Sequence, residues 1–179
     1  ARKRHYSRGA TVFHQGDPAV TLHVVSRGLL ALRFTQEDGQ STTLRVFGPG
    51  DAFGRAGVSV DNPTRVGSCV ALEDCDTYEL TLELMAQSRV KYPALNNGMM
   101  MVLLSELSQA YARLLDLSNV PADVRVRRSL AALAARCTRQ ATGISVPITQ
   151  DDLAGLASTS RSTVNRVLAQ QETLRRVAL

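Results

Sequence analysis

Glycine and proline residues divide the first ninety residues of the chain into short segments. They recur at intervals of about ten residues and exclude a long helix, because proline blocks helical hydrogen bonding and glycine favours turns. Glu37–Gln40 has the composition of a hairpin turn. Short strands at this spacing predict a β-sandwich or barrel. The expected strands are Leu22–Val25, Leu29–Phe34, Thr42–Phe47, Gly67–Leu72 and Thr77–Leu80.

A different pattern begins after Tyr92 and Pro93. Apolar residues recur at alternating steps of three and four over residues 97–118, which is the periodicity of a coiled-coil helix. Such a seam has to be buried, and a parallel dimer with a second copy of the chain would bury it. Met101, Leu104 and Leu115 lie off the seam and can pack on the β-rich part. The seam residues are Met100, Leu103, Leu107, Ala110, Leu114 and Leu117.

Pro121 separates this helix from a second one. Proline cannot continue a helix, but it can open the next, so we expect a helix over residues 122–140. Gly143 is its expected left-handed cap.

Charge is distributed unevenly along the chain. Residues 1–120 hold twelve basic and twelve acidic side chains, whereas residues 121–179 hold nine arginines and four acids and carry the whole net charge of +5. A neutral body with a basic C-terminal third is typical of nucleic-acid binders. A solvated basic face is the alternative interpretation.

Residues 148–168 have the layout of a helix-turn-helix. Thr149 and Asp152 form a capping box for a short helix over residues 150–157, and Ser160 caps a second helix over residues 161–171. Ser158 stands where this motif commonly has glycine at the turn. The second helix is expected to read bases with Arg161, Ser162, Asn165 and Arg166. Residues near helix N-termini, expected to contact phosphates, are Thr149, Gln150, Ser160 and Thr163.

The order of these elements resembles that of the family of the cyclic-AMP receptor protein and FNR. The resemblance covers nearly the whole chain and is carried by residues 8–32, 47–54 (FGPGDAFG), 71–80 and 115–134. It implies an α+β fold with a cyclic-nucleotide-binding-type β-roll. The implied division is a β-roll at 1–95, a dimerisation helix at 96–118, and a winged helix-turn-helix domain at 119–179, in which Thr173–Leu179 resembles one strand of an incomplete wing.

The resemblance also suggests a ligand pocket in the β-roll. Gly54 and Arg65 match residues that grip cyclic AMP in the family, whereas Arg55 and Val66 stand where it has a glutamate and a hydroxyl residue. On the long helix, Ser105 matches a base-contacting position and Glu106 departs from it. These differences leave open whether the effector is cyclic AMP or a more anionic molecule. An ion pair between Arg65 and an acid such as Asp61 is the structural alternative.

The resulting hypothesis is a cytoplasmic, homodimeric bacterial transcription regulator that binds double-stranded DNA and, by resemblance, RNA polymerase. Two alternatives remain: a ligand-independent DNA binder with a vestigial pocket, and a regulatory module whose C-terminal helices bind protein. The sequence contains no recognisable catalytic triad, phosphate-binding glycine loop or metal-ligand spacing, so we expect neither an enzyme nor a metal site. No apolar run approaches the ~20 residues of a membrane span. Three cysteines indicate reduced thiols.

Overall fold

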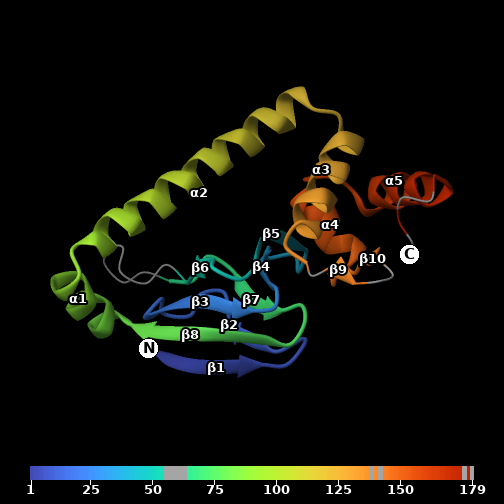
Figure 1. The fold of residues 1–179 in the computed structure, drawn as a ribbon. Coiled ribbons are helices and arrows are strands. Elements are labelled where there is room, and N and C mark those ends of the chain that lie inside the picture. Colours follow the sequence, from blue (N-terminus) through green and yellow to red (C-terminus); the bar gives the residue numbers. More distant parts are fainter. Residues whose placement is uncertain (55–63, 138, 141–142, 175–176, 178–179) are drawn as a thin grey trace.

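The computed structural model describes residues 1–54, 64–137, 139–140, 143–174 and 177. Its N-terminal strands are β1 (Arg2–Tyr6), β2 (Thr11–Phe13), β3 (Thr21–Arg27), β4 (Leu30–Thr35), β5 (Ser41–Phe47), β6 (Ala52–Phe53), β7 (Ser68–Ala71) and β8 (Cys75–Thr81). They form two antiparallel sheets, ordered β1-β8-β3-β6 and β2-β7-β4-β5 (Figure 1). The five strands expected from the sequence are confirmed as β3, β4, β5, β7 and β8.

The two sheets enclose an apolar core. Alternation along β7 buries Cys69 and Ala71 and turns their neighbours outward, as expected for a strand with one face in a core. The aromatic rings of Phe47 and Phe53 stack with their centroids 5.0 Å apart. Cys69 and Cys75 are buried free thiols. The hairpin turn expected at Glu37–Gln40 is confirmed, because Thr35 on β4 pairs with Ser41 on β5.

Two helices follow the β-rich part. Helix α1 (Leu82–Lys91) was not expected; its N-cap Thr81 accepts a hydrogen bond from the Leu84 amide. Helix α2 (Ala94–Asn119) contains the expected helix 97–118 and extends it by three residues at the start and one at the end. Its 26 residues give a length of roughly 39 Å. Helix α2 stands away from the sheets along most of that length (Figure 1).

Helix α3 (Ala122–Ala134) begins directly after Pro121, as expected, but ends earlier than the sequence indicated. The expected helix 122–140 is therefore wrong at its C-terminal end. Strands β9 (Arg139–Gln140) and β10 (Gly143–Ile144) pair there as a small antiparallel sheet. Gly143 belongs to β10 and does not cap α3, although its φ of +133° is one that glycine accommodates readily.

The last two helices are α4 (Gln150–Leu156) and α5 (Arg161–Thr173), within two residues of the expected bounds. Thr173, expected to begin a wing strand, is instead the last residue of α5. The rest of that expected strand falls largely outside the described residues. Among the described residues, no helix combines the length and apolar character that a membrane span requires.

The C-terminal helices share a hydrophobic core with the β-rich part. Leu29, Ala31, Val46 and Leu72 from the N-terminal part lie in one cluster with residues of α3, α4 and α5. The approach is close at Gly155, where an added Cβ would lie 2.6 Å from the backbone nitrogen of Thr43. The C-terminal cluster members are Val126, Leu133, Leu153, Ala154, Ala157, Val164, Val167 and Leu168. The expected domain boundaries, after residue 95 and before residue 119, stay a prediction. The shared hydrophobic core contains residues from both sides of them.

Candidate DNA-binding face and candidate ligand pocket

The β-rich part holds a buried arginine with no acidic partner among the described residues. The side chain of Arg65 donates hydrogen bonds to the Gly54 carbonyl and, at 2.8 Å, to the Thr21 hydroxyl. Its guanidinium lies over the Phe13 ring, 4.1 Å from the centroid. Gly54 is required at this place, because its φ is +97° and an added Cβ would lie 2.7 Å from an Arg65 nitrogen.

His23 lies beside Arg65 and is 2% exposed. Burial, reinforced by the positive charge of Arg65, lowers the pKa of His23 to about 4, so the imidazole is neutral near pH 7. His23 Nδ1, Arg65 Nε and Thr77 Oγ1 are buried without a hydrogen-bond partner among the described residues. Unpaired buried polar atoms are uncommon, so these three atoms mark hydrogen-bonding capacity that the described residues leave unused.

The other expected pocket residues are placed differently. Val66 is 53% exposed, and Glu106 on α2 forms an ion pair with Arg45 on β5 at 2.7 Å. Ser105 accepts a hydrogen bond from the Gln109 amide within α2. Arg55 and Asp61 lie outside the described residues. Gly54 and Arg65 are therefore the expected pocket residues that the structure brings together.

Sequence reasoning missed the residues that surround Arg65. Thr21, His23 and Val25 occupy every second position of β3, so their side chains share the inward face of this strand. The two-residue period of the strand could have predicted that Thr21 and His23 face the inside of the β-roll, where Arg65 was expected. Phe13 on the short strand β2 carried no comparable signal.

Local capping residues determine where the two C-terminal helices start. At α4, the Thr149 hydroxyl accepts from the Asp152 amide at 3.1 Å, and the Asp152 carboxylate accepts from the Thr149 amide at 3.3 Å. The expected capping box is thus confirmed. At α5, the Ser160 hydroxyl accepts from the Thr163 amide at 3.2 Å. Gln150 is the first residue of α4 and is half-buried.

The turn between α4 and α5 depends on Ser158. Its φ of +49° lies in the left-handed region, where glycine is common because other residues are strained there. The guanidinium of Arg125 on α3 holds the turn by donating to the carbonyls of Ala157 and Ser158, at 2.9 and 3.0 Å. The absence of glycine is therefore compatible with the tight connection.

Helix α5 has one buried face and one exposed face. Val164, Val167 and Leu168 pack into the shared core. The side chains expected to read bases are all exposed on the opposite face: Arg161, Ser162, Asn165 and Arg166. Arg161 is 3.3 Å from Asp151, in a pair so exposed that it contributes little stability and leaves the arginine available.

Comparisons with known proteins agree with this architecture. Residues 3–89 match the family model of the cyclic nucleotide-binding domain, and residues 124–175 match that of the Crp-like helix-turn-helix domain. The chain is 35% identical over 167 residues to the cyclic AMP receptor protein of Thermus thermophilus, covering 93% of this chain and 75% of the relative. The chain belongs to the CRP/FNR family. It is a transcription regulator with a helix-turn-helix DNA-binding domain, and not an enzyme.

Two further proteins resemble this CRP/FNR-family regulator. The CRP-like cAMP-activated global transcriptional regulator of Mycobacterium tuberculosis is 28% identical, with 92% of this chain and 74% of the relative covered. The structure of FixK2 from Bradyrhizobium japonicum superposes with a TM-score of 0.85 at 20% identity, covering 100% of this chain and 88% of that one. The second likeness establishes the fold alone.

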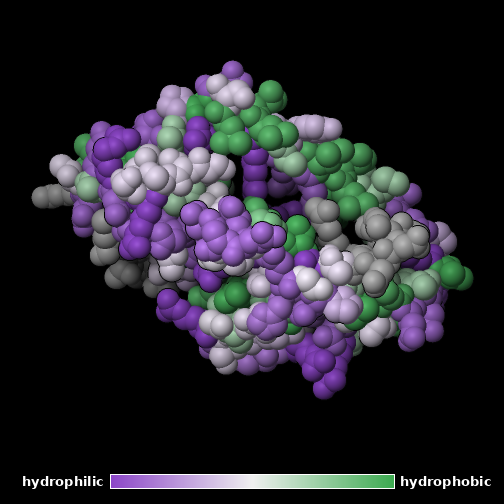
Figure 2. Space-filling model, turned by 180° about the vertical axis from the view of Figure 1, so that it is seen from behind, coloured by the Kyte–Doolittle hydropathy of each residue, from purple (hydrophilic) through white to green (hydrophobic). Residues whose placement is uncertain are grey.

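The long helix of this CRP/FNR-family regulator exposes most of its apolar side chains. None of its residues is buried; Leu103, Leu107 and Leu114 of the seam are 40%, 50% and 61% exposed. Figure 2 shows hydrophobic side chains gathered along α2. Met101, Leu104 and Leu115, expected to pack on the β-rich part, are also exposed, so that expectation was wrong. A continuous row of exposed large apolar side chains along one helix indicates an interaction site.

Proposed function

We propose that this regulator is a homodimer that binds a palindromic operator, with a small ligand in the β-roll controlling its DNA-competent state. The observation that carries the proposal is the exposed face of α5, which presents Arg161, Ser162, Asn165 and Arg166 while Val164 and Val167 anchor the helix. Arginine bridges the O6 and N7 atoms of guanine in the major groove, and serine and asparagine reach other base edges.

The apolar seam of α2 supports the dimer. Met100, Leu103, Leu107, Ala110, Leu114 and Leu117 alternate at steps of three and four and are all exposed in the single chain. A second copy in parallel orientation would bury this seam against its own. Two-fold symmetry would then place two α5 helices on half-sites about 10 base pairs apart, centre to centre. Contact with RNA polymerase belongs to the same proposal.

Selection from a randomised duplex library tests the DNA-binding part of the proposal. We expect enriched sequences to contain two inverted half-sites separated by about one helical turn, each with guanines at the positions read by Arg161 and Arg166. Because Ser162 has no carboxylate to accept from cytosine, the neighbouring position should be degenerate. Enrichment of a single, non-repeated site would contradict the dimeric mode of binding.

Cyclic-nucleotide control rests on Arg65 and Gly54. The unpaired Nε of Arg65 and Nδ1 of His23 leave hydrogen-bonding capacity for a bound molecule. A guanidinium is suited to a phosphate, because it presents several donors in one plane. Cyclic AMP titrated in a calorimeter is expected to bind wild type more tightly than Arg65→Gln.

A ligand-independent regulator is the second candidate. It is favoured by the contacts of Arg65, which already donates to Gly54 and Thr21, and by the exposure of Val66. No calorimetric signal at millimolar cyclic AMP, together with unchanged operator affinity, would select this candidate. Micromolar binding accompanied by a change in operator affinity would reject it.

A further inference from the structure

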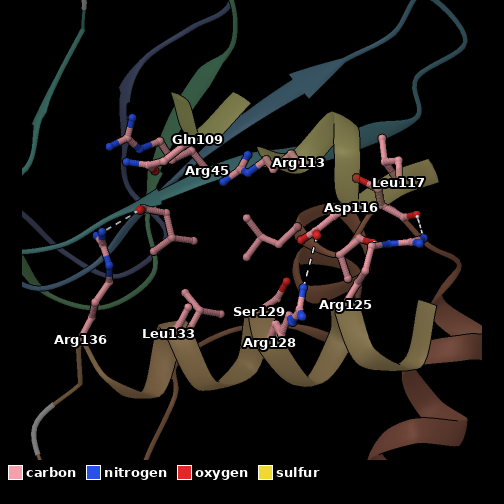
Figure 3. Close-up of a pocket in the computed structure, with 15 residues that line it drawn as sticks. Arg45, Gln109, Arg113, Asp116, Leu117, Arg125, Arg128, Ser129, Leu133 and Arg136 are labelled. Carbon is pink, nitrogen blue, oxygen red and sulfur yellow. Dashed lines mark hydrogen bonds and ion pairs between the residues drawn. The ribbon is translucent and has the colours of Figure 1, made fainter. Parts of the chain in front are cut away.

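An arginine-rich cleft lies between the β-roll and the DNA-binding helices. Its volume is about 270 Å³, and its walls come from β5, the C-terminal half of α2, helix α3 and the turn after α4. Figure 3 shows side chains from α2 and β5 facing side chains from α3 across the space. The cleft is separate from the β-roll pocket, because Arg65, Gly54 and His23 are not among the residues that line it.

Among the described residues, five guanidinium groups line this cleft. Arg45 comes from β5 and Arg113 from α2, so both belong to the wall nearest the β-roll and the long helix. Arg125 and Arg128 come from α3, and Arg136 follows its end. The two sets approach from opposite walls, so a molecule between them would touch both the sensor side and the DNA-binding side (Figure 3).

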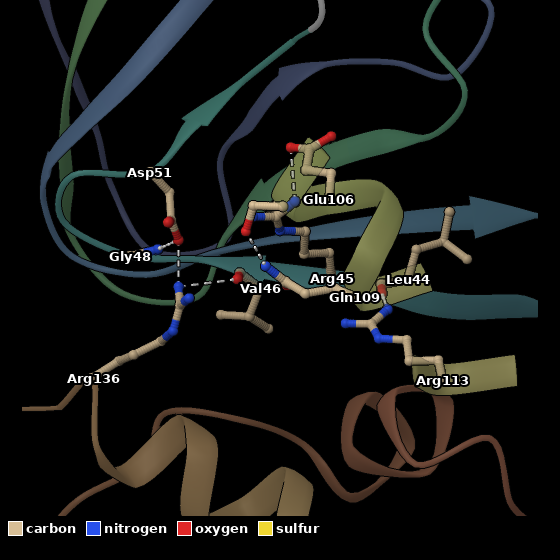
Figure 4. Close-up of polar contacts among 10 residues, drawn as sticks. Leu44, Arg45, Val46, Gly48, Asp51, Glu106, Gln109, Arg113 and Arg136 are labelled. Carbon is tan, nitrogen blue, oxygen red and sulfur yellow. Dashed lines mark hydrogen bonds and ion pairs between the residues drawn. The ribbon is translucent and has the colours of Figure 1, made fainter. Parts of the chain in front are cut away.

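Three of these arginines already have acidic partners. Arg45 pairs with Glu106 at 2.7 Å, and Arg128 pairs with Asp116 at 3.2 Å. Arg136 pairs with Asp51 (Figure 4). These pairs neutralise three of the five positive charges. The Arg128–Asp116 pair joins α3 to α2 across the cleft, and the Arg136–Asp51 pair joins the end of α3 to the β-roll.

The remaining two arginines have no carboxylate partner among the described residues. Arg113 donates to the main-chain carbonyl of Leu44 (Figure 4). Arg125 donates to the carbonyls of Val120, Ala157 and Ser158. Burial of the guanidinium and, to a smaller extent, the positive charge of Arg45 lower the pKa of Arg113, because both disfavour its charged form. Two positive charges therefore remain uncompensated.

We propose that the cleft binds a small phosphorylated molecule with two or more negative charges. Guanidinium groups bind phosphate oxygens through paired hydrogen bonds, and two uncompensated arginines match at least a dianion. Ser129 on α3 and Gln109 on α2 also line the space and supply a hydroxyl and an amide. The volume lies just below the range of about 300–1,000 Å³ typical of ligand pockets, which favours a compact ligand.

Binding in this cleft would couple the two parts of the molecule. A phosphate bridging Arg113 on α2 and Arg125 on α3 would favour the arrangement in which α3 faces β5. Because Arg125 also holds the turn between α4 and α5, the ligand would act on the element that orients the DNA-reading helix. This inference goes beyond cyclic-nucleotide control and does not require it.

Calorimetric titration of the chain with inorganic pyrophosphate, without DNA, tests the proposal. We expect saturable binding to the wild type. Binding should be at least tenfold weaker to Arg113→Gln, which removes an uncompensated charge, and to Arg128→Gln, which leaves the Asp116 carboxylate in the cleft without its cation. Arg89→Gln on α1 is the matched control, because it removes the same charge from a residue that does not line the cleft; its affinity should equal that of the wild type. Circular dichroism checks that each variant is folded, and Arg113→Lys, which keeps the charge, should retain intermediate affinity if Arg113→Gln does not fold.

Three results would overturn the proposal. The first is no binding at millimolar pyrophosphate. The second is binding that is lost in Arg65→Gln but kept in the cleft variants, which would place the anion in the β-roll. The third is complete displacement of pyrophosphate by duplex DNA together with loss of non-specific DNA binding in Arg113→Gln, which would assign the arginines to DNA phosphates. The titration itself contains no DNA, and duplex DNA is added only in the competition that gives the third result. Failure of the proposed operator recognition therefore leaves the outcome of the titration unchanged.

Discussion

Arg33 on β4 and Asp152 on α4, which are 119 residues apart in sequence, form a bidentate ion pair in which both nitrogen–oxygen distances are 2.9 Å. The carboxylate also accepts from the Thr43 hydroxyl at 2.6 Å, and its side chain is only 4% exposed. Burial alone would raise the pKa of Asp152, but hydrogen bonds from Arg33, Thr43 and Thr149 lower it below its usual value. This pair attaches the first helix of the DNA-binding motif to the β-roll.

Removing the arginine should destabilise the protein. Arg33→Ala leaves a buried carboxylate without its cation, and we expect a loss of roughly 2 kcal/mol in the free energy of unfolding, a value reduced because Arg33 is partly exposed. Urea unfolding measures the change. Arg27→Ala, which breaks an exposed pair with Asp76, should change stability by less than about 0.5 kcal/mol. Equal effects of the two substitutions would show that the Arg33 pair has no special role.

Acidification should destabilise the fold through His23. The folded pKa is about 4 and the unfolded value about 6.5, so between these values the unfolded chain binds a proton that the folded chain excludes. The stabilisation is complete above about pH 6.5 and is lost as the pH falls towards 4, by roughly 3 kcal/mol in total. We expect His23→Gln to flatten this part of the stability–pH curve measured by urea unfolding. His14→Gln, at an exposed histidine, should keep the wild-type slope.

Glycine at the turn of the helix-turn-helix should stabilise the protein. Ser158 has a φ of +49°, and Ser158→Gly relieves the strain of the left-handed conformation while keeping the carbonyl that accepts from Arg125. We expect a gain of about 1 kcal/mol, measured as a higher Tm, with unchanged operator affinity. Ser162→Gly, within α5, should lower the Tm instead. A lower Tm for Ser158→Gly would contradict the assignment of strain.

A charge in the seam of α2 should separate the protomers. Leu107→Lys places an ammonium group at the centre of the proposed dimer interface, and sedimentation analysis should show a monomer. Val90→Lys on α1 makes the same chemical change at a residue that is 84% exposed and off the seam, and it should remain dimeric. A stable Leu107→Lys dimer would rule out this seam as the interface.

Truncation of the base-reading arginines should reduce specific binding. Arg161→Ala and Arg166→Ala are each expected to weaken operator binding by about 1–3 kcal/mol and to relax preference at one base position. Fluorescence anisotropy with single-base operator variants measures both effects. Arg89→Ala, far from α5 in sequence, should change neither. Unchanged base preference in both variants would remove α5 as the reading helix.

Elements with local signals were predicted most accurately from the sequence. The starts of α4 and α5 follow from the side chains of Thr149 and Ser160, which cap their helices within three residues. The end of α3 was misplaced because residues 135–140 contain no glycine or proline to mark it. Helix α1 was missed although Thr81 and Pro93 flank it, because its apolar residues do not form a clear stripe.

Contacts distant in sequence could not be predicted in this way. Nothing in the local pattern around Arg33 identifies Asp152 as its partner, and the same holds for Arg45 and Glu106. Glu106 was expected in a ligand pocket because it occupies a position that lies beside the ligand in the family, whereas in the fold it pairs with Arg45. The exposed face of α5 was predictable, since it depends only on the helical period and on which residues are apolar.

The hydrophobic core shared by the β-roll and the C-terminal helices limits which domain exchanges this regulator can tolerate. A chimera that joins its helix-turn-helix to a foreign sensor would expose Val126, Leu153 and Val164 unless the new sensor supplies matching apolar residues. It would also leave Asp152 without Arg33. A working exchange of sensors among such regulators therefore requires that the contact surface on β4 and β5 stay with its helix-turn-helix. A chimera joined only at a sequence boundary, without that surface, should be prone to aggregation.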